Sequence, residues 1–370
     1  MTGTPFQLTP DQVEEFGREL DALRQRIVDN LGEQDVTYLR NLIKTQRALE
    51  VTGRGLLFAG FLPPAWLAGV ATLSLAKILD NMEIGHNVMH GQYDWTRIPE
   101  LGSQRFEWDN VAPADNWRHS HNYIHHTFTN VLGKDRDIGY GILRMDSAQK
   151  WHPYYLGNPV YATLLALLFQ WGVMLHDLEI ERVVKGERSW AENVPVLRKI
   201  ARKAARQIGK DYVLFPLLTG PLAPLTLLGN ASANLVRNLW AFAIIFCGHF
   251  PADVESFTEE EAENESRGQW YLRQILGSAN ISGGPLFHIL SGNLSHQIEH
   301  HLFPDLPARR YPQIAGEVRE ICERYGLPYH TGPLRKQLWS VAKKIVRLAL
   351  PGPGTGPEAT VDSDRQLRAA

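Results

Sequence analysis

Four long apolar runs constrain the fold of this 370-residue chain more than any other feature. The first, Gly55 to Ala76, carries no charge over a length sufficient to cross a bilayer, although Pro63 and Pro64 interrupt it. The other three are residues 158–175, 212–229 and 238–250. A single run of this kind would fit a buried helix of a soluble protein, but four favour an integral membrane protein of the all-α class.

The overall composition indicates that the membrane helices carry a large polar part. The mean hydropathy of −0.24 is low for a chain made only of membrane helices. We therefore expect about four membrane-spanning helices and a helical, water-exposed cap. The net charge of −2 and the lack of a basic stripe argue against nucleic acid as a partner.

Charge distribution predicts the topology. Residues 182–210 hold nine Lys or Arg against two Glu, which is typical of a cytoplasmic loop. We expect residues 158–175 to be re-entrant or to lie in the membrane interface, because the histidine-rich segment before them then shares a side with this loop. Residues 212–229 and 231–249 are expected to form one helical hairpin, and residues 41–61 with the helix after Pro64 another.

The same patterns suggest a division of the chain. Residues 1–40 are expected to be an N-terminal amphipathic helical segment, with Thr9 as N-cap and Pro10 at the first helical position. No cleavable signal peptide is visible, because this segment is polar and charged. Residues 41–350 would form the membrane domain, and residues 351–370 a disordered tail.

The C-terminal part of the membrane domain shows two helical patterns. Apolar residues recur at helical spacing from Tyr311 to Tyr325 and stop at Gly326. Residues 334–350 form a basic amphipathic pattern, which favours a surface that faces lipid headgroups. Cys247 and Cys322 are expected to be buried thiols in a reducing compartment.

Histidine is concentrated in three short segments. Eight of the 14 histidines lie in the strings HNVMH, HNYIHH and HQIEHH, namely His86, His90, His121, His125, His126, His296, His300 and His301. Histidines four residues apart share one face of an α-helix, so each string can direct two imidazoles to one point. The second histidine of each adjacent pair is turned by about 100° from the first, which favours two metal ions side by side.

The number and type of donors narrow the choice of metal ion. Imidazole suits iron, copper, zinc or nickel, and eight nitrogen donors exceed the needs of a zinc site. A carboxylate di-iron site would need two Glu-x-x-His motifs, and Glu83 with His86 forms the one present. We therefore expect a His-rich site whose imidazoles are oriented by Glu83, Asp80 or Glu299.

The three histidine strings, read in order, resemble those of the membrane fatty acid desaturases. The second stands in WRHSHNYIHHTFTN and the third in GNLSHQIEHHLFPDLPARRYPQI. The chain is most similar to bacterial acyl-CoA 9-desaturases of the actinobacterial type, from about KILDNMEIGHNVMHGQYDW to RYGLPYHTGPLRKQ. The resemblance implies a non-haem di-iron centre that uses O2 and two electrons to insert a cis double bond into a saturated acyl chain.

The resemblance also implies a ligand set. It assigns ligand roles to His86, His90, His121, His125, His126, His300 and His301. In the family the third box begins with His or Gln, and both His296 and Gln297 stand there; helical spacing favours His296. A further family ligand lies near the cytoplasmic end of the last membrane helix, where His249 fits. Asn238, three turns earlier on nearly the same face, could point toward the same pocket.

The implied reaction defines the substrate and leaves alternatives open. An unactivated C–H bond offers no acidity and no leaving group, so the acyl chain has to pass the metals in a narrow apolar tunnel. Stearoyl-CoA or palmitoyl-CoA, desaturated at position 9, is the expected substrate, with Arg118 or residues 182–210 as partners for the CoA phosphates. The alternatives are a front-end (delta-6 type) or acyl-lipid desaturase, a membrane hydroxylase, and, outside enzymes, a His-rich metal transporter.

The expected electron donor is a separate protein. Some desaturases carry a fused cytochrome b5 domain with a His-Pro-Gly-Gly motif, and this sequence has no such motif. Electrons from NAD(P)H would then arrive through a ferredoxin or flavin reductase, or through a cytochrome b5-type donor. The expected location is the membrane, the inner one if the chain is bacterial, with the active site on the cytoplasmic face.

Overall fold

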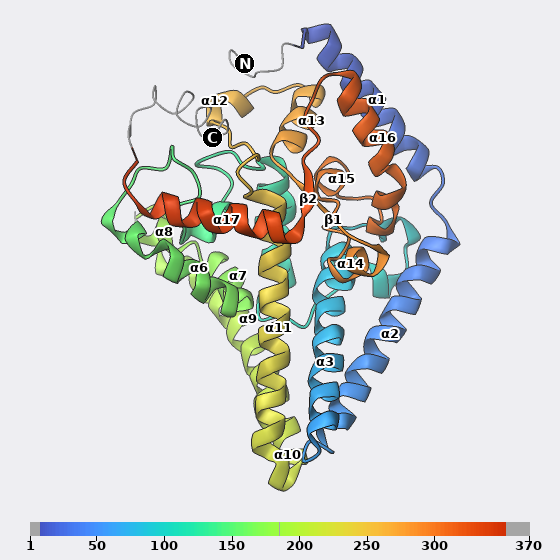
Figure 1. Cartoon of the computed structure of the whole chain (residues 1–370), viewed down its shortest axis with the longest axis vertical. Helices are drawn as coiled ribbons and strands as arrows, with labels where there is room; N and C mark the ends of the chain where they lie inside the picture. The colour runs from blue at the N-terminus through green and yellow to red at the C-terminus, as the bar shows by residue number, and fades with distance from the viewer. Residues whose placement is uncertain (1–7, 185, 353–370) are drawn as a thin grey trace.

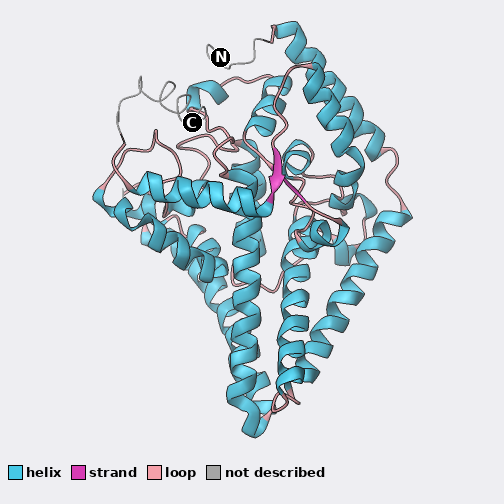
Figure 2. Ribbon diagram, viewed as in Figure 1, coloured by secondary structure: helices cyan, strands magenta, loops and turns pink. Residues whose placement is uncertain are grey.

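Helices make up most of the structure, a computed structural model that describes residues 8–184 and 186–352. Four long helices run toward one tip, while the other elements gather at the opposite, broad end (Figures 1 and 2). The described strands are β1 (Asn280–Ser282) and β2 (Thr331–Pro333), which pair in parallel. The predicted all-α class is confirmed. The predicted tail, residues 351–370, lies outside the described residues from position 353 on.

The long helices form two hairpins. The first joins α2 (Glu33–Leu57) to α3 (Pro63–Leu79), so Pro63 and Pro64 begin a helix instead of interrupting one. The second runs from α9 (Trp190–Ile208) through a π-helix (Gly209–Leu214) and α10 (Phe215–Leu218) into α11 (Ala223–His249). Both hairpins turn at the tip, where α10 lies beside the α2–α3 connection (Figure 1). The first hairpin was predicted; α2 continues through the expected domain boundary at residue 40.

The predicted bounds of the second hairpin are wrong. Residues 231–249 do not begin a new helix, because α11 is continuous from Ala223 to His249. The other arm is α9, which lies in the basic segment predicted to be a loop. Ser189 and Glu192 form a capping box that begins this helix. Lys203 of this helix pairs with Glu107, and Lys210 of the following π-helix pairs with Asp109.

One helix of the described residues is long and apolar enough to cross a membrane. It covers residues Gly220–His249 with a mean hydropathy of 1.2. Helices α6 (Asn158–Leu167) and α7 (Phe169–His176) pass the same test only when taken together, and they meet at an angle of 103°. The bend fits the expectation that this run does not cross straight. Of the about four spans that we predicted, one is therefore supported by the length and hydropathy of a described helix.

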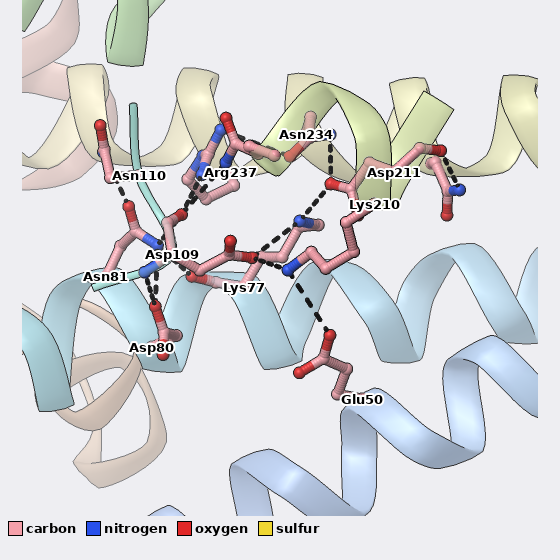
Figure 3. A network of polar contacts seen from close by, with 12 residues as sticks. Glu50, Lys77, Asp80, Asn81, Asp109, Asn110, Lys210, Asp211, Asn234 and Arg237 are labelled. Atoms are coloured by element: carbon pink, nitrogen blue, oxygen red, sulfur yellow. Dashed lines mark hydrogen bonds and ion pairs between the residues drawn. The ribbon is translucent and has the colours of Figure 1, made fainter. Parts of the chain in front are cut away.

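A buried ion network joins the two hairpins (Figure 3). Asp211, fully buried in the π-helix, accepts from Arg54 of α2 at 2.7 Å and from Lys77 of α3 at 2.8 Å. Lys77 also contacts Asp109 at 3.2 Å, and Lys210 contacts the same carboxylate at 2.8 Å. Since buried charges are costly unless paired, these contacts fix the two hairpins and the loop around residue 109 against each other.

The broad end is built around an apolar core. Helix α1 (Pro10–Val28) packs with α13 (Arg267–Leu276), α15 (Gln297–Leu302) and α16 (Tyr311–Arg324), and Phe16, Tyr271 and Tyr311 are fully buried there. Thr9 forms the predicted N-cap of α1, and Gly326 adopts a positive φ of 65° just after α16. Cys247 and Cys322 are buried thiols, as predicted.

Shorter helices complete this end of the molecule. They are α4 (Asn87–Met89), α5 (Ala114–Trp117), α8 (Ile180–Val184), α12 (Glu259–Ala262) and α14 (Pro285–Leu290). The predicted basic helix is α17 (Leu334–Ala349), which runs across the long helices (Figure 1). The strand pair β1–β2 links α15 to α17, because β1 precedes the third histidine segment and β2 leads directly into α17.

Candidate metal centre

The first histidine segment continues helix α3 into the broad end. After Leu79 the helix widens into a π-helix, Asp80–His86, which passes into α4. His90 follows α4 and donates its backbone N–H to the carbonyl of His86 at 3.1 Å. The two rings therefore lie one above the other, with centroids 4.5 Å apart. Because π-helical turns cluster at functional sites, this local widening itself marks the segment.

The second segment lies in another π-helix, and this winding explains how three of its histidines share one direction. The π-helix covers Arg118–His125, and the backbone N–H of His126 donates to the carbonyl of His121, five residues earlier. On an α-helix His126 would be turned about 140° from His121. The wider π turn brings residues five apart nearly into line. His121, His125 and His126 can thus face one centre together.

The third segment is held by β1. Asn280 accepts the backbone N–H of Ile298 at 2.9 Å, and so caps the short helix α15. His300 and His301 are both fully buried on this helix. From the other side α11 ends at His249, whose Nε2 lies 3.3 Å from Nε2 of His301. Four segments distant in sequence therefore converge on one buried volume.

The side chains form overlapping groups that could hold metal ions. One group joins His86, His90, His121 and His300; a second joins His125, His249 and His301. His126 lies with His300 and His301 in a third group, between the other two. Within each group one donor atom per residue lies within 4.8 Å of the others. Eight of the nine histidines predicted as ligands are brought together, in an arrangement that fits two adjacent ions.

In several of the imidazoles one nitrogen is hydrogen-bonded and the other is left for a metal. Nδ1 of His125 contacts Asp135 at 2.9 Å, Nδ1 of His121 contacts Asp137 at 3.0 Å, and Nδ1 of His301 contacts Gln274 at 3.1 Å. By contrast, the buried Nε2 atoms of His90, His121, His125, His126 and His300 have no hydrogen-bond partner. Buried polar atoms without partners are rare, so these five nitrogens are candidate donors to a metal ion.

The protonation states favour metal binding. Burial, together with the neighbouring His121, lowers the pKa of His86 to about 3. Burial also holds the pKa values of His90, His126, His300 and His301 well below the usual range. For His125 burial acts in the same direction, but the carboxylates of Asp135 and Asp137 raise its pKa. Most of these rings are thus neutral at pH 7, as metal ligands must be.

The expectation that His296 shares a point with His300 is wrong. Helix α15 begins only at Gln297, and His296 has a φ of −104° and a ψ of 58°, outside the helical range. Its ring lies against His288 with centroids 4.5 Å apart, away from the three groups. Gln297 takes the place instead, since its side-chain amide lies 2.9 Å from Nε2 of His249.

Gly248 makes room for this arrangement. A Cβ at Gly248 would lie 2.9–3.0 Å from the side chain of Gln297, closer than real Cβ atoms approach. Oε1 of Gln297 is buried and has no hydrogen-bond partner. The sequence left open whether His296 or Gln297 lies at the centre. These contacts favour Gln297.

The other predicted residues have supporting positions. Glu83 accepts from Tyr38 at 2.6 Å and from Asn293 at 3.0 Å, and burial raises its pKa to about 8. It reaches the centre through Asn87, which contacts both Glu83 and Nδ1 of His86. Glu83 therefore helps to orient a histidine, as expected for a group behind the ligands.

Glu299, Asp80 and Arg118 do not contact the histidine groups. Glu299 accepts from Asn280 at 2.9 Å and from Tyr329 at 2.7 Å, which fixes α15 on β1. Asp80 accepts the backbone N–H of Asp109 at 2.9 Å. Arg118 donates to the carbonyl of Ser103 at 2.9 Å and stays partly exposed.

Asn238 lines the same cavity as His249, as expected, but it does not belong to the histidine groups. Its eleven-residue separation from His249 corresponds to about 16 Å along α11. Its amide binds the break between α6 and α7, donating to the carbonyl of Leu167 at 2.9 Å and accepting from the N–H of Gln170 at 3.4 Å. Backbone groups freed by a helix break need such partners, so Asn238 stabilises the bend.

Sequence reasoning missed the residues that hold the imidazoles from behind. Asp135 and Asp137 were recognisable in principle, as a D-x-D string that begins nine residues after the second histidine segment. His176, outside the histidine strings, is 6% exposed, with Nε2 3.0 Å from a carboxylate oxygen of Asp137. Gln274 and Asn87 had no signal, because single amides are common in any chain. His119 is exposed and stacks on Tyr123.

A cavity of about 760 Å³, counted with its opening, borders the centre. His86, His121, His249 and Gln297 line one end of it. Its middle is apolar, with Trp108, Trp117, Phe169, Val173, Ala241 and Ile245 in the wall. Trp117 stacks on His121 with centroids 4.5 Å apart, so the apolar wall reaches the histidines directly. The apolar part of this lining suits an elongated apolar ligand.

Fold and site together define a helical protein with a buried, His-rich candidate metal centre beside an apolar cavity. The model of the family "fatty acid desaturase" matches residues 64–333, and the chain belongs to this family. It is an oxidoreductase of the desaturase class.

Individual relatives are known from several organisms. The chain is 48% identical to the NADPH-dependent stearoyl-CoA 9-desaturase of Mycobacterium tuberculosis, over 93% of this chain and 82% of the relative. It is 26% identical to the sn-1 linoleoyl-lipid 6-desaturase of Synechocystis, over 76% of this chain and 79% of the relative. The Delta(5) fatty acid desaturase A of Dictyostelium discoideum is 28% identical over 70% of this chain and 58% of the relative.

Proposed function

We propose that the protein desaturates saturated acyl-CoA, with stearoyl-CoA or palmitoyl-CoA as substrate and a cis double bond at position 9 as product. The observation that carries the proposal is the apolar cavity that ends at the histidine groups. The similarity to the mycobacterial stearoyl-CoA 9-desaturase, at 48% identity, favours this substrate over an acyl-lipid, because the acyl-lipid 6-desaturase of Synechocystis is only 26% identical.

Two iron ions are the proposed cofactor. The first would be held by His86, His90, His121 and His300, the second by His125, His249 and His301 with Gln297, and His126 lies between them. When bound, the iron pair supplies the oxidising power of O2 that an unactivated C–H bond requires. The all-imidazole donor set with unpaired Nε2 atoms fits a divalent metal of this class.

The protein's own side chains orient and shield this chemistry. Asp135, Asp137 and Gln274 fix the tautomers of three imidazoles through their Nδ1 atoms. The rings of Trp117 and Trp108, with centroids 5.4 Å apart, close the cavity wall beside the histidines and exclude water. The acyl chain would be held against this wall, so that its position in the cavity sets which carbons react.

The two hairpins are the proposed membrane part. Their shared tip exposes large apolar side chains, namely Phe58, Phe61, Leu62, Leu214, Leu217 and Leu218. Exposed apolar surface of this extent suits lipid and not water. The histidine centre lies at the end opposite the tip, which we assign to the cytoplasmic face of the membrane, the inner one in a bacterium.

The electrons are proposed to come from NAD(P)H through a separate ferredoxin, flavin reductase or cytochrome b5-type protein. The mycobacterial relative is described as NADPH-dependent, which supports the pyridine nucleotide as the source. Arg118, partly exposed at the start of the second histidine segment, remains our candidate contact for the CoA phosphates.

Expression with a matching reductase in cells that lack their own desaturase tests the proposal. We expect new unsaturated fatty acids with the double bond at position 9, measured by mass spectrometry of derivatised chains. His300→Ala should abolish the product, whereas His119→Ala, an exposed histidine outside the groups, should not. An iron-loaded protein that yields no unsaturated chain would contradict the proposal, and a hydroxylated product would replace it by the hydroxylase alternative.

A further inference from the structure

The far end of the apolar cavity is polar, which a tunnel for a plain hydrocarbon chain does not need. Gln170 and Arg237 both line the cavity there. Arg237 lies twelve residues before His249 on α11, about 18 Å along the helix axis, and Gln170 lies six residues before His176 on α7, about 9 Å. The polar end is thus separated from the histidines by the apolar middle of the cavity.

Arg237 is buried without a direct ion pair among the described residues, although the carboxylates of Asp109 and Asp211 act on it from a distance. It is 1% exposed, and no ion pair joins it to a carboxylate among the described residues. Its three hydrogen bonds go to neutral oxygens, those of Asn238, Asp109 and Asn234, at 3.2, 3.3 and 3.4 Å. A guanidinium has five N–H groups, so this cation has donor capacity to spare.

Gln170 is the second incompletely bonded group. It is 3% exposed, its Oε1 has no hydrogen-bond partner, and its backbone N–H donates to Oδ1 of Asn238. Nε of Arg237 donates to that same oxygen. Asn238 therefore holds the two residues next to each other at the bend between α6 and α7.

The nearby ion network does not satisfy these groups. Its carboxylates, Asp109 and Asp211, are already paired with Lys77, Lys210 and Arg54 (Figure 3). A methyl group placed at the end of the cavity would leave Gln170 and Arg237 buried and underbonded, which costs free energy. A hydroxyl would donate to one and accept from the other.

We propose that this polar end binds a terminal hydroxyl, so that the enzyme also accepts acyl-CoA whose chain carries an oxygen at the ω end. The inference rests on the proposed acyl-CoA desaturase function. A neutral hydroxyl can pass the apolar middle of the cavity at lower cost than a carboxylate, because it carries no charge. The site thus adds a second recognition point to the chain, beyond the histidines.

The test compares stearoyl-CoA with 18-hydroxystearoyl-CoA, offered together to the full-length, iron-loaded protein with a reductase. We expect a preference of about fivefold to tenfold for the hydroxylated chain, the effect of one or two buried hydrogen bonds. Gln170→Leu should remove most of this preference, measured as the ratio of the two products, and Gln170→Met repeats the test with an unbranched side chain. Gln104→Leu, an exposed position in a loop, is the control and should leave the ratio unchanged.

Two results would overturn the inference. One is a wild-type preference for stearoyl-CoA; the other is a preference for the hydroxylated chain that Gln170→Leu and Gln170→Met both leave intact. If neither substrate is desaturated, the proposed function fails, and the polar end is then tested by displacement of labelled stearoyl-CoA. Tighter displacement by the hydroxylated chain, lost in Gln170→Leu, would still support the site, and equal displacement would refute it.

Discussion

Two buried polar centres lie within the same helical framework and differ in how their groups are bonded. In the ion network between the hairpins, Asp211 meets Arg54 and Lys77, and Asp109 meets Lys77 and Lys210. In the histidine centre, five buried Nε2 atoms have no partner. In the first arrangement each carboxylate has its cations within the protein, whereas the second gathers several unpaired imidazole nitrogens in one buried volume. Burial alone therefore does not mark a functional site; a cluster of unpaired buried donors of one kind does.

Loss of a histidine should have the largest effect, because it removes a ligand from the incomplete centre. We expect His125→Ala to abolish desaturation and to reduce the bound iron, since His125 belongs to the group with His249 and His301. Product analysis and metal determination on the purified protein measure both. The control is His288→Ala, which changes a histidine outside the groups and should leave both quantities unchanged. Full activity in His125→Ala would remove this residue from the proposed ligand set.

Breaking the ion network should act on stability and not on metal. Asp211→Ala leaves Arg54 and Lys77 without their shared carboxylate, so we expect the free energy of unfolding to fall by about 3–5 kcal/mol. The iron content of the folded fraction should stay unchanged. Thermal denaturation in detergent follows the first quantity and metal analysis the second.

Glu317→Ala provides the matched control for this prediction. It removes an exposed pair with Arg26, whose contribution should be about 0–1 kcal/mol. If Asp211→Ala proved as mild as this control, the paired network would not hold the hairpins together. If it lost iron from folded protein, the two centres would not be separable.

Removal of a carboxylate behind an imidazole should have a smaller effect than loss of a ligand. Asp135 accepts from Nδ1 of His125 at 2.9 Å, and Asp135→Asn weakens this contact while keeping the shape of the side chain. We expect a loss of about 10–100-fold in metal affinity, with the fold retained. Titration with a competing chelator measures it. Asp305→Asn changes an exposed carboxylate and should leave the affinity unaltered.

The sequence predicted the donors better than the backbone that presents them. Histidine spacing and the apolar runs were sufficient to predict an all-α fold, and eight of the nine proposed histidine ligands meet. The error at His296 arose because α-helical spacing was assumed up to that residue, whereas α15 begins one residue later. The π-helix at Arg118–His125 could not be predicted either, since its i to i+5 bonds leave no spacing signal of their own.

The basic segment shows a second limit of sequence reasoning. Its positive charges suggested a loop, because the partners of Lys203 and Lys210 lie about a hundred residues earlier in the chain. Pairing across such a separation depends on the fold and cannot be read from local composition. In the same way, helical phase placed Asn238 at the cavity that His249 also lines, but it gave no sign of the bond to the break between α6 and α7.

Substitutions of His296 and Gln297, at the start of α15, should have the smallest effect on metal affinity. They also test which of the two residues serves the centre. Gln297 lies 2.9 Å from His249 and its Oε1 is unpaired, so Gln297→Ala should lower metal affinity by about tenfold, as for loss of one supporting contact. His296→Ala should keep full metal content, since its ring contacts only His288 among the histidines. Gln297→His, which restores a nitrogen donor, should recover affinity. Equal losses in Gln297→Ala and His296→Ala would mean that both residues serve the centre, and a loss in His296→Ala alone would restore the choice that helical spacing first favoured.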